Sequence, residues 1–404
     1  MRSNWVTVFV LALFAVSAVG QTASSAVGTR EVVWSNQSGD GTANLASSIF
    51  YPAVTAGINK PIRQVVGGHP VVVFLHGWGR LGSEYYRIGN ALAELGIVAV
   101  MMNTGHQSFA VLGHDARAMF GALEVESARL DGPWEGAFDM RRVGLMGHSM
   151  GGAVMSLVLN ENPLQPHVNP GYVCGMGLAP ANPTIVCAGL DVRVPVGLVS
   201  GQGDLLTPPQ THAVPYYDLL KPDEGLKFHY QLNANCTHMN LVGLAPGNPE
   251  VFFRTSKIFR AFFGHFLLGS VIGLEAVLGV DGYGDPNLVA VDVDTAVPQA
   301  WCANKVLLGS TIRVSVAAEP GFAGLVVGGQ MGMPTMTSIG TLLIDSASAF
   351  SFGETFIFGD RLDVLVTIPY VPELVGCDFA IQGVGGAMNS VLMLGSALSL
   401  GITN

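Results

Sequence analysis

The sequence predicts an α/β fold with a mostly parallel, doubly wound sheet, followed by a small C-terminal all-β sandwich. Between about residues 30 and 270, short continuous apolar runs alternate with segments of helical spacing. Parallel strands that are buried on both faces and joined by helices give this pattern. From about residue 305 the helical periodicity ends, and short β-rich runs follow one another between Gly, Pro and Ser turns. We therefore expect an α/β domain at 21–302 and a β-sandwich at 303–404.

Each element is predicted from a local pattern. The strands of the α/β domain are apolar runs that stop at Gly, Pro or polar residues, at 71–75, 97–102, 142–146, 172–176, 194–200 and 226–232. The helices are segments of helical spacing, at 110–130, 153–159 and 250–268. The clearest strands of the sandwich are 311–316, 340–344 and 362–368.

The first twenty residues predict a secretory signal peptide. Arg2 precedes an apolar stretch from Trp5 to Val19, and Ala18-Val19-Gly20 forms a small-x-small cleavage site. This apolar core is short for a membrane span, and no later segment reaches about 18 uncharged apolar residues. We expect a secreted, extracellular or cell-surface protein without a transmembrane segment after signal cleavage.

The charge pattern excludes some functions. The formal net charge is -10 and only 12% of the residues are charged, without a basic patch, so we expect no nucleic-acid partner. The acidic stretch at 281–285, with Asp292 and Asp294 nearby, lacks the regular spacing of a calcium-binding loop. We expect neither a metal site nor an organic cofactor.

Five cysteines in an exported chain indicate disulfides with one thiol left over. Cys174 lies in an apolar strand run and is expected to be a buried free thiol. A bridge between Cys187 and Cys236 would brace the loop around residue 238, and Cys302 can pair with Cys377. The sequence alone leaves this connectivity open.

The most informative motif is Gly147-His148-Ser149-Met150-Gly151, directly after an apolar run and before a helical segment. This G-x-S-x-G pattern predicts a nucleophile elbow, in which a serine sits on a sharp strand-to-helix turn and glycines avoid collisions. Such a serine needs two backbone N–H donors for the oxyanion. We expect them from Met150, which follows the serine, and from Trp78, which follows the strand at 71–75. His76 beside it is expected to be structural.

The remaining candidates follow in the order Ser, Asp, His. Asp204 comes after the apolar run at 194–200, and His238 lies in the polar loop after the strand at 226–232. In an α/β sheet the carboxyl ends of parallel strands meet at one edge, where such loops place an acid and a base near the nucleophile. Other carboxylates in this interval do not directly follow an apolar strand, namely Asp191, Asp218 and Asp223. We expect Ser149, Asp204 and His238 to form a catalytic triad.

These motifs resemble the α/β-hydrolases, in particular the group of dienelactone hydrolases, chlorophyllases, platelet-activating-factor acetylhydrolases and cutinase-like polyesterases. The residues that carry the resemblance are 50–53, 71–79, 147–152, 201–208 and 237–238. Dienelactone hydrolases carry a cysteine as nucleophile, and this chain has Ser149. Cutinase-like enzymes commonly carry a Trp soon after the strand that follows the elbow strand, where this chain reads Leu178-Ala179-Pro180-Ala181-Asn182-Pro183. Trp78 and the pair Tyr85-Tyr86 are the aromatic residues that could compensate for this Trp. We expect Trp78, Tyr85 and His148 to contact substrate.

The sequence thus predicts a secreted serine hydrolase of carboxylic esters that forms an acyl-enzyme. The 88 residues between Ser149 and His238 are largely used by predicted sheet elements, which predicts an open cleft without a lid, accessible to lipidic or polymeric esters. Two alternatives stay open: an amide or lactone hydrolase with the same triad, and a catalytically silent binding protein of this fold. The C-terminal module holds no histidine, and a surface- or polymer-binding role is its functional interpretation.

Overall fold

The computed structural model describes most of the chain between residues 26 and 403. The described ranges are 26–105, 107–162, 168–185, 190–220, 225–245, 249–270, 273–295, 298–302, 306–318, 321–337, 340–357, 361–387 and 393–403. They form two compact units: a first unit of 26–268 with 284–292, and a second unit of 269–283 with 293–403. The predicted signal peptide at 1–20 lies outside the described residues. The predicted boundaries at 21–302 and 303–404 stay predictions.

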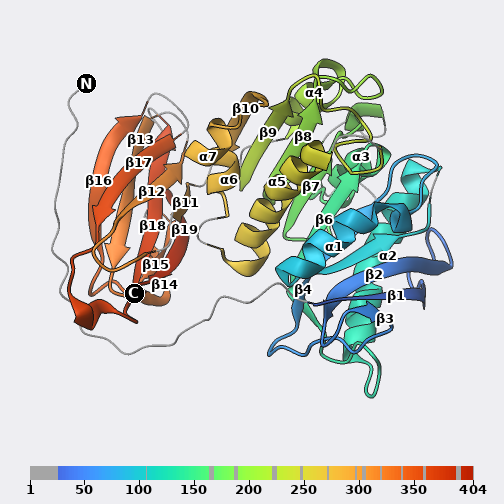
Figure 1. Cartoon of the computed structure of the whole chain (residues 1–404), viewed down its shortest axis with the longest axis horizontal. Helices are drawn as coiled ribbons and strands as arrows, with labels where there is room; N and C mark the ends of the chain where they lie inside the picture. The colour runs from blue at the N-terminus through green and yellow to red at the C-terminus, as the bar shows by residue number, and fades with distance from the viewer. Residues whose placement is uncertain are drawn as a thin grey trace. The chain divides into compact units, whose positions relative to one another are not determined.

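The first unit is built on a mixed sheet, which within the described residues has ten strands in the order β10-β9-β8-β7-β6-β4-β5-β2-β1-β3 (Figure 1). The pairs from β5 through β4, β6, β7 and β8 to β9 are parallel, whereas β2 pairs with β5 and β1 with β2 in antiparallel fashion. The strands are β1 Ala26–Ser35, β2 Asn44–Ala53, β3 Gly57–Ile58, β4 His69–Leu75, β5 Val98–Met102, β6 Phe138–His148, β7 Cys174–Leu178, β8 Val196–Gly201, β9 Leu226–Leu232 and β10 Leu288–Thr295.

Helices cover both faces of this sheet. Val73 of β4 shares a buried core with Leu112 of α2 and Val154 of α3. Gly144 of β6 faces the other way, and a Cβ added to it would lie 2.9 Å from the ring of Phe263 in α5. Burial on both faces explains why the central strands read as continuous apolar runs. The helices and 3-10 turns of this unit are η1 Gly82–Tyr85, α1 Tyr86–Leu95, α2 Phe109–Ala128, α3 Met150–Val158, η2 Pro183–Ile185, η3 Pro209–Thr211, α4 Ala213–Leu219 and α5 Pro249–Leu268.

The second unit is a β-sandwich with a short helical segment. The sheet β11-β12-β17 packs against the sheet β16-β13-β18-β19 through a core that includes Val314 of β12, Leu325 of β13 and Leu398 of β19, and β14 pairs with β15. Buried Glu275 of α6 accepts hydrogen bonds from Trp301 Nε1 at 3.0 Å and from Arg313 at 2.5 Å, which ties the helical segment to the sheets. The elements are α6 Glu275–Leu278, α7 Val280–Tyr283, β11 Gln299–Cys302, β12 Thr311–Ala317, β13 Gly321–Gly328, β14 Met331–Thr337, β15 Gly340–Ile344, β16 Phe350–Ile357, β17 Arg361–Thr367, η4 Pro372–Leu374, β18 Asp378–Ala387 and β19 Met393–Gly401.

The predicted fold class is confirmed: a doubly wound α/β sheet precedes an all-β part. In the described part of the chain, no helix combines the length and hydropathy needed to cross a membrane. Asp285 of the acidic stretch pairs with Arg254.

The structure confirms one of the cysteine predictions and does not contain the disulfide bond that it can test. Cys174 is a buried free thiol on β7, as predicted. The described cysteines form no disulfide bond in the structure, so the predicted pairing of Cys302 with Cys377 is not made there. Cys302 ends β11 of one sheet, whereas Cys377 precedes β18 of the other. Cys236 is a buried free thiol, and its predicted partner Cys187 lies outside the described residues.

Candidate active site

The turn between β6 and α3 carries Ser149. The strand ends at His148 and the helix begins at Met150, so one residue makes the whole change of direction, with φ 53° and ψ -116°. A positive φ at a residue with a Cβ is uncommon and strained, and such strain is concentrated at functional sites. The predicted elbow geometry is therefore present at the predicted serine.

Glycines permit the close packing around this turn. A Cβ on Gly151 would lie 2.1 Å from the carbonyl oxygen of Leu75, and one on Gly147 would lie 2.2 Å from the carbonyl oxygen of Gly151. Both distances are far below van der Waals contact, and both neighbours are backbone atoms that cannot rotate away. The elbow is therefore pressed against the end of β4, where the loop of Gly77 and Trp78 begins.

Asp204 lies in a tight turn after β8 and is almost fully buried. Its Oδ1 accepts hydrogen bonds from the backbone N–H groups of Leu206 at 2.9 Å and Thr207 at 2.8 Å. The Thr207 hydroxyl lies 2.7 Å from Oδ2. Burial alone would raise the pKa of Asp204, but the hydrogen bonds from His238 and Thr207 outweigh it and hold this pKa below its ordinary value. The carboxyl group therefore stays ionised at neutral pH.

His238 lies in the loop after β9, with its Nδ1 2.7 Å from Asp204 Oδ2. Since a carboxylate only accepts, Nδ1 carries the proton and Nε2 is the atom available to act as a base. The Thr237 N–H donates to Asn240 Oδ1 at 2.7 Å, and the Gly203 N–H donates to the Cys236 carbonyl at 3.1 Å. The acid turn and the histidine loop are thus joined through their backbones as well as through the Asp204–His238 pair.

The two expected oxyanion donors are the backbone N–H groups of Met150, directly after Ser149, and of Trp78, in the loop after β4. Met150 is the first residue of α3, where backbone N–H groups have no partner within the helix. Trp78 follows β4, and its side chain is 57% exposed, with its ring 6.2 Å from that of Phe109. Donors after the nucleophile and after this strand are what an acyl-transfer site of this kind requires.

Tyr85 and His148 are placed differently from our expectation. Both side chains are buried, and the Tyr85 hydroxyl lies 2.9 Å from Nδ1 of His148. Direct contact of these two with substrate is therefore not supported by the structure, because neither exposes a surface to solvent.

Sequence reasoning also missed Thr207, whose hydroxyl contacts both Asp204 and Nδ1 of His238. The Thr207-Pro208 sequence after the acid was visible, but it carries no signal of that contact.

Exposed apolar side chains stand on the loops that carry the candidate residues. Leu205 and Leu206 directly follow Asp204 and are 88% and 69% exposed, and Trp78 extends from the loop after β4. Strands β4, β6 and β8 run parallel, so these loops lie at the same edge of the sheet as Ser149. The surface at this edge offers apolar contacts to a ligand.

Comparison with known proteins agrees with this geometry. A family model described as PETase, PET hydrolase-like, matches residues 16–244, which is more than half of the chain and includes Ser149, Asp204 and His238. The chain belongs to the PETase-like family. This membership confirms the α/β-hydrolase fold and the resemblance to cutinase-like polyesterases that the motifs predicted.

A relative of this PETase-like chain is a bis(hydroxyethyl) terephthalate hydrolase from Streptomyces coelicolor. The two are 27% identical over 193 residues, which amount to 48% of this chain and 55% of the relative. The chain thus spans about half the length of the curated relative it matches.

A second Ser–His–Asp cluster lies inside the sheet of this PETase-like domain. Ser200 Oγ of β8 is 2.7 Å from His229 Nε2 of β9, but His229 Nδ1 is 3.6 Å from Asp292 Oδ2, too far for a hydrogen bond. Ser200 and His229 are buried, and Ser200 lies within a regular strand rather than at a turn. This cluster joins neighbouring strands and has neither the elbow nor the access that a nucleophile needs.

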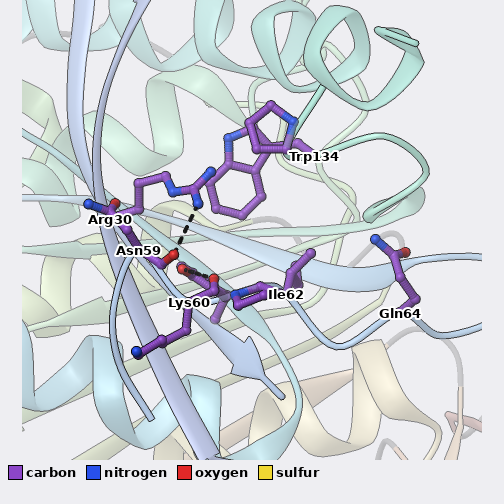
Figure 2. Close-up of a pocket in the computed structure, with 9 residues that line it drawn as sticks. Arg30, Asn59, Lys60, Ile62, Gln64 and Trp134 are labelled. Atoms are coloured by element: carbon purple, nitrogen blue, oxygen red, sulfur yellow. Dashed lines mark hydrogen bonds between the residues drawn. The ribbon is translucent and has the colours of Figure 1, made fainter. Parts of the chain in front are cut away.

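A cavity of about 400 Å³ has none of the candidate residues in its lining (Figure 2). The Arg30 guanidinium stands 5.3 Å from the centre of the Trp134 ring, and the Tyr51 hydroxyl donates to the Lys60 carbonyl at 2.6 Å. The first contact joins β1 to the segment before β6, and the second joins β2 to the segment after β3. The lining residues are Arg30, Tyr51, Asn59, Lys60, Pro61, Ile62, Gln64, Pro133 and Trp134.

We predict that Gly151→Ala disrupts the elbow. The added methyl group would collide with the backbone of β4, and we expect a loss of about 3 kcal/mol or more in the free energy of unfolding, with loss of the site's function. Urea denaturation followed by circular dichroism measures this. Gly121→Ala in α2 is the matched control: it has no atom within 4 Å of the added Cβ, and alanine favours a helix by about 1 kcal/mol over glycine. Equal stability of the two variants would contradict the packing constraint.

Proposed function

We propose that this protein is a secreted serine hydrolase that cleaves carboxylic esters, with Ser149 as nucleophile, His238 as general base and Asp204 as the group that orients the histidine. The observation that carries the proposal is the strained turn at Ser149, at the same sheet edge as the 2.7 Å pair of Asp204 and His238. Membership of the PETase-like family supports it. Retention of all three residue types weighs against a catalytically silent binding protein.

In the proposed reaction, Ser149 Oγ attacks the acyl carbonyl carbon while its proton passes to Nε2 of His238. The carbonyl oxygen becomes an oxyanion, which accepts hydrogen bonds from the backbone N–H groups of Trp78 and Met150. Collapse of this intermediate breaks the ester bond, and His238 returns the proton to the leaving alkoxide, which departs as an alcohol. Water then attacks the acyl-enzyme by the same sequence, releasing the carboxylic acid and restoring the serine.

Ionised Asp204 has two tasks in this scheme. It fixes the imidazole in the tautomer with the proton on Nδ1, and it stabilises the imidazolium that forms in each half-reaction. Its four hydrogen-bond donors keep the carboxylate charged although it is buried. No step of this mechanism requires a metal or an organic cofactor.

For the substrate we propose hydrophobic esters, including aromatic polyesters and their fragments. Support comes from the exposed Trp78, Leu205 and Leu206 and from the relative named as a bis(hydroxyethyl) terephthalate hydrolase. The described residues between Ser149 and His238 mostly form α3, β7, β8, α4, β9, two 3-10 turns and the loops between them, which supports a cleft without a lid. The predicted signal peptide supports secretion, and a surface-binding role of the second unit remains part of the proposal.

An amide or lactone hydrolase with the same triad is the second enzymatic candidate. Cleavage of an amide requires His238 to protonate an amine leaving group, which the geometry also permits, so a substrate panel has to separate the two reactions. The exposed apolar residues favour hydrophobic esters over polar amides.

We predict that Ser149→Ala abolishes hydrolysis of p-nitrophenyl esters and of bis(hydroxyethyl) terephthalate. Loss of a nucleophilic serine lowers kcat roughly 10⁵- to 10⁶-fold in a serine hydrolase. The measurements are p-nitrophenol release, chromatography of the terephthalate products, and mass spectrometry of a phosphonate label at residue 149. Ser156→Ala is the control, since the hydroxyl of this buried serine on α3 donates to the Ala153 carbonyl of the same helix. Turnover that survives Ser149→Ala would refute the proposed mechanism.

We predict that replacing Leu205 and Leu206 together by serine weakens binding of hydrophobic esters. If each leucine loses about 1 kcal/mol of apolar contact, KM for long-chain or aromatic esters rises roughly tenfold or more. Acetyl esters should be affected less, because they reach these side chains less. Leu130→Ser, which removes an equally exposed leucine after α2, is the matched control. Unchanged KM for all esters would show that the substrate does not contact this surface.

A further inference from the structure

We propose that Tyr85 and His148 are positioning residues, which hold the loop that carries the Trp78 amide and the loop that carries His238 in place around Ser149. This inference rests on the proposed serine hydrolase function. It assigns these two residues to orientation of the catalytic groups rather than to contact with substrate.

A continuous chain of hydrogen bonds connects the two loops. The Gly77 N–H donates to the Tyr85 hydroxyl at 3.1 Å, and this hydroxyl lies 2.9 Å from His148 Nδ1. On the other side of the ring, His148 Nε2 lies 3.1 Å from the backbone carbonyl oxygen of His238. This chain of hydrogen bonds begins at Gly77, one residue before Trp78. It passes through His148, the residue before Ser149, and ends on the His238 carbonyl.

The direction of each hydrogen bond follows from its end points. The carbonyl oxygen of His238 can only accept, so Nε2 of His148 carries a proton. Burial, and then the nearby His238, lower the pKa of His148 well below its ordinary value, so the ring is neutral and Nδ1 has a lone pair. The Tyr85 hydroxyl therefore donates to Nδ1 while it accepts from Gly77. Burial also raises the pKa of Tyr85, which keeps that donor proton in place.

Packing reinforces the hydrogen bonds. The ring of His148 lies 4.5 Å from that of His238, and the ring of Tyr85 lies 4.7 Å from that of Phe74 in β4. A Cβ on Gly77 would lie 3.1 Å from His148 Nδ1 and 3.4 Å from the Ser149 Cβ, so the oxyanion loop directly contacts the elbow. Because Tyr85 and His148 are buried, water does not compete for these hydrogen bonds.

A role in positioning predicts a particular kinetic signature. Displacement of an oxyanion donor or a general base by a fraction of an ångström affects the transition state more than the bound substrate. Loss of this chain of hydrogen bonds should therefore lower kcat and leave KM nearly unchanged. Residues that contacted substrate would instead raise KM when truncated.

The first test is Tyr85→Phe, which removes one hydroxyl from a buried ring. We expect kcat to fall roughly tenfold to hundredfold, with KM within about twofold of the unmodified protein. Affinity for an alkyl boronic acid, which forms a tetrahedral adduct with serine, should fall in parallel with kcat/KM. The matched control is Tyr172→Phe, whose buried hydroxyl donates to the Ala116 carbonyl at 2.6 Å, on the helix layer of α2. It should lower the melting temperature similarly and leave kcat unchanged.

The second test compares His148→Gln with His148→Leu. A glutamine amide can donate to the His238 carbonyl and accept from Tyr85, as the neutral imidazole does, whereas leucine offers neither group. We expect glutamine to retain most of kcat and leucine to lose at least as much as Tyr85→Phe. The double variant Tyr85→Phe with His148→Leu should lose little more than His148→Leu alone, because both changes break one chain.

The outcomes separate this inference from the proposed function. If Ser149→Ala is inactive but Tyr85→Phe keeps full kcat, or raises KM at constant kcat, the positioning role is overturned and the serine mechanism stands. Equal losses of kcat in Tyr85→Phe and Tyr172→Phe would also overturn it, since that loss would follow stability alone. If Ser149→Ala remains active, the proposed function itself fails.

Discussion

The first unit depends on one steric constraint, the contact between the elbow and the end of β4. Gly151 lies against the Leu75 carbonyl so closely that no side chain fits between them. This contact holds the start of α3 against the sheet and leaves Ser149 in its strained conformation, at a cost of about 1 to 3 kcal/mol. The same contact brings Gly77 next to Ser149, so the position of the loop that carries the proposed Trp78 donor is a consequence of how the elbow packs.

Hydrogen bonds and charges then orient the side chains of Asp204, His238 and His148 around the elbow. The buried carboxylate of Asp204 is compensated by backbone and side-chain donors, which point one of its oxygens at His238. Neutral His148 completes the arrangement without adding charge next to His238. A histidine that carried a proton on both nitrogens there would place a second cation against the His238 imidazolium of the proposed mechanism, and burial prevents this.

Prediction from sequence succeeded where a local pattern carries the information. The strand at 226–232 and the sandwich strand at 340–344 were placed at the observed bounds, and Ser149, Asp204 and His238 each follow a strand whose apolar run is visible. It failed where the partner is distant in the chain: Tyr85 and His148 are 63 residues apart, and nothing in either segment encodes their hydrogen bond. The strands β18 and β19 were missed because Gly, Ala and Ser weaken their alternation.

Among the described residues of the first unit, Cys174 and Cys236 are buried thiols. Burial raises the pKa of Cys236 to about 11 and raises that of Cys174 further, so both are protonated and unreactive at neutral pH. Cys174 lies in the centre of the sheet, whereas Cys236 lies in the loop just before His238. Alkylation of Cys236 therefore reports local opening of the histidine loop, and alkylation of Cys174 reports unfolding of the whole sheet. Alkylation of the two thiols therefore distinguishes a local opening of the His238 loop from loss of the fold.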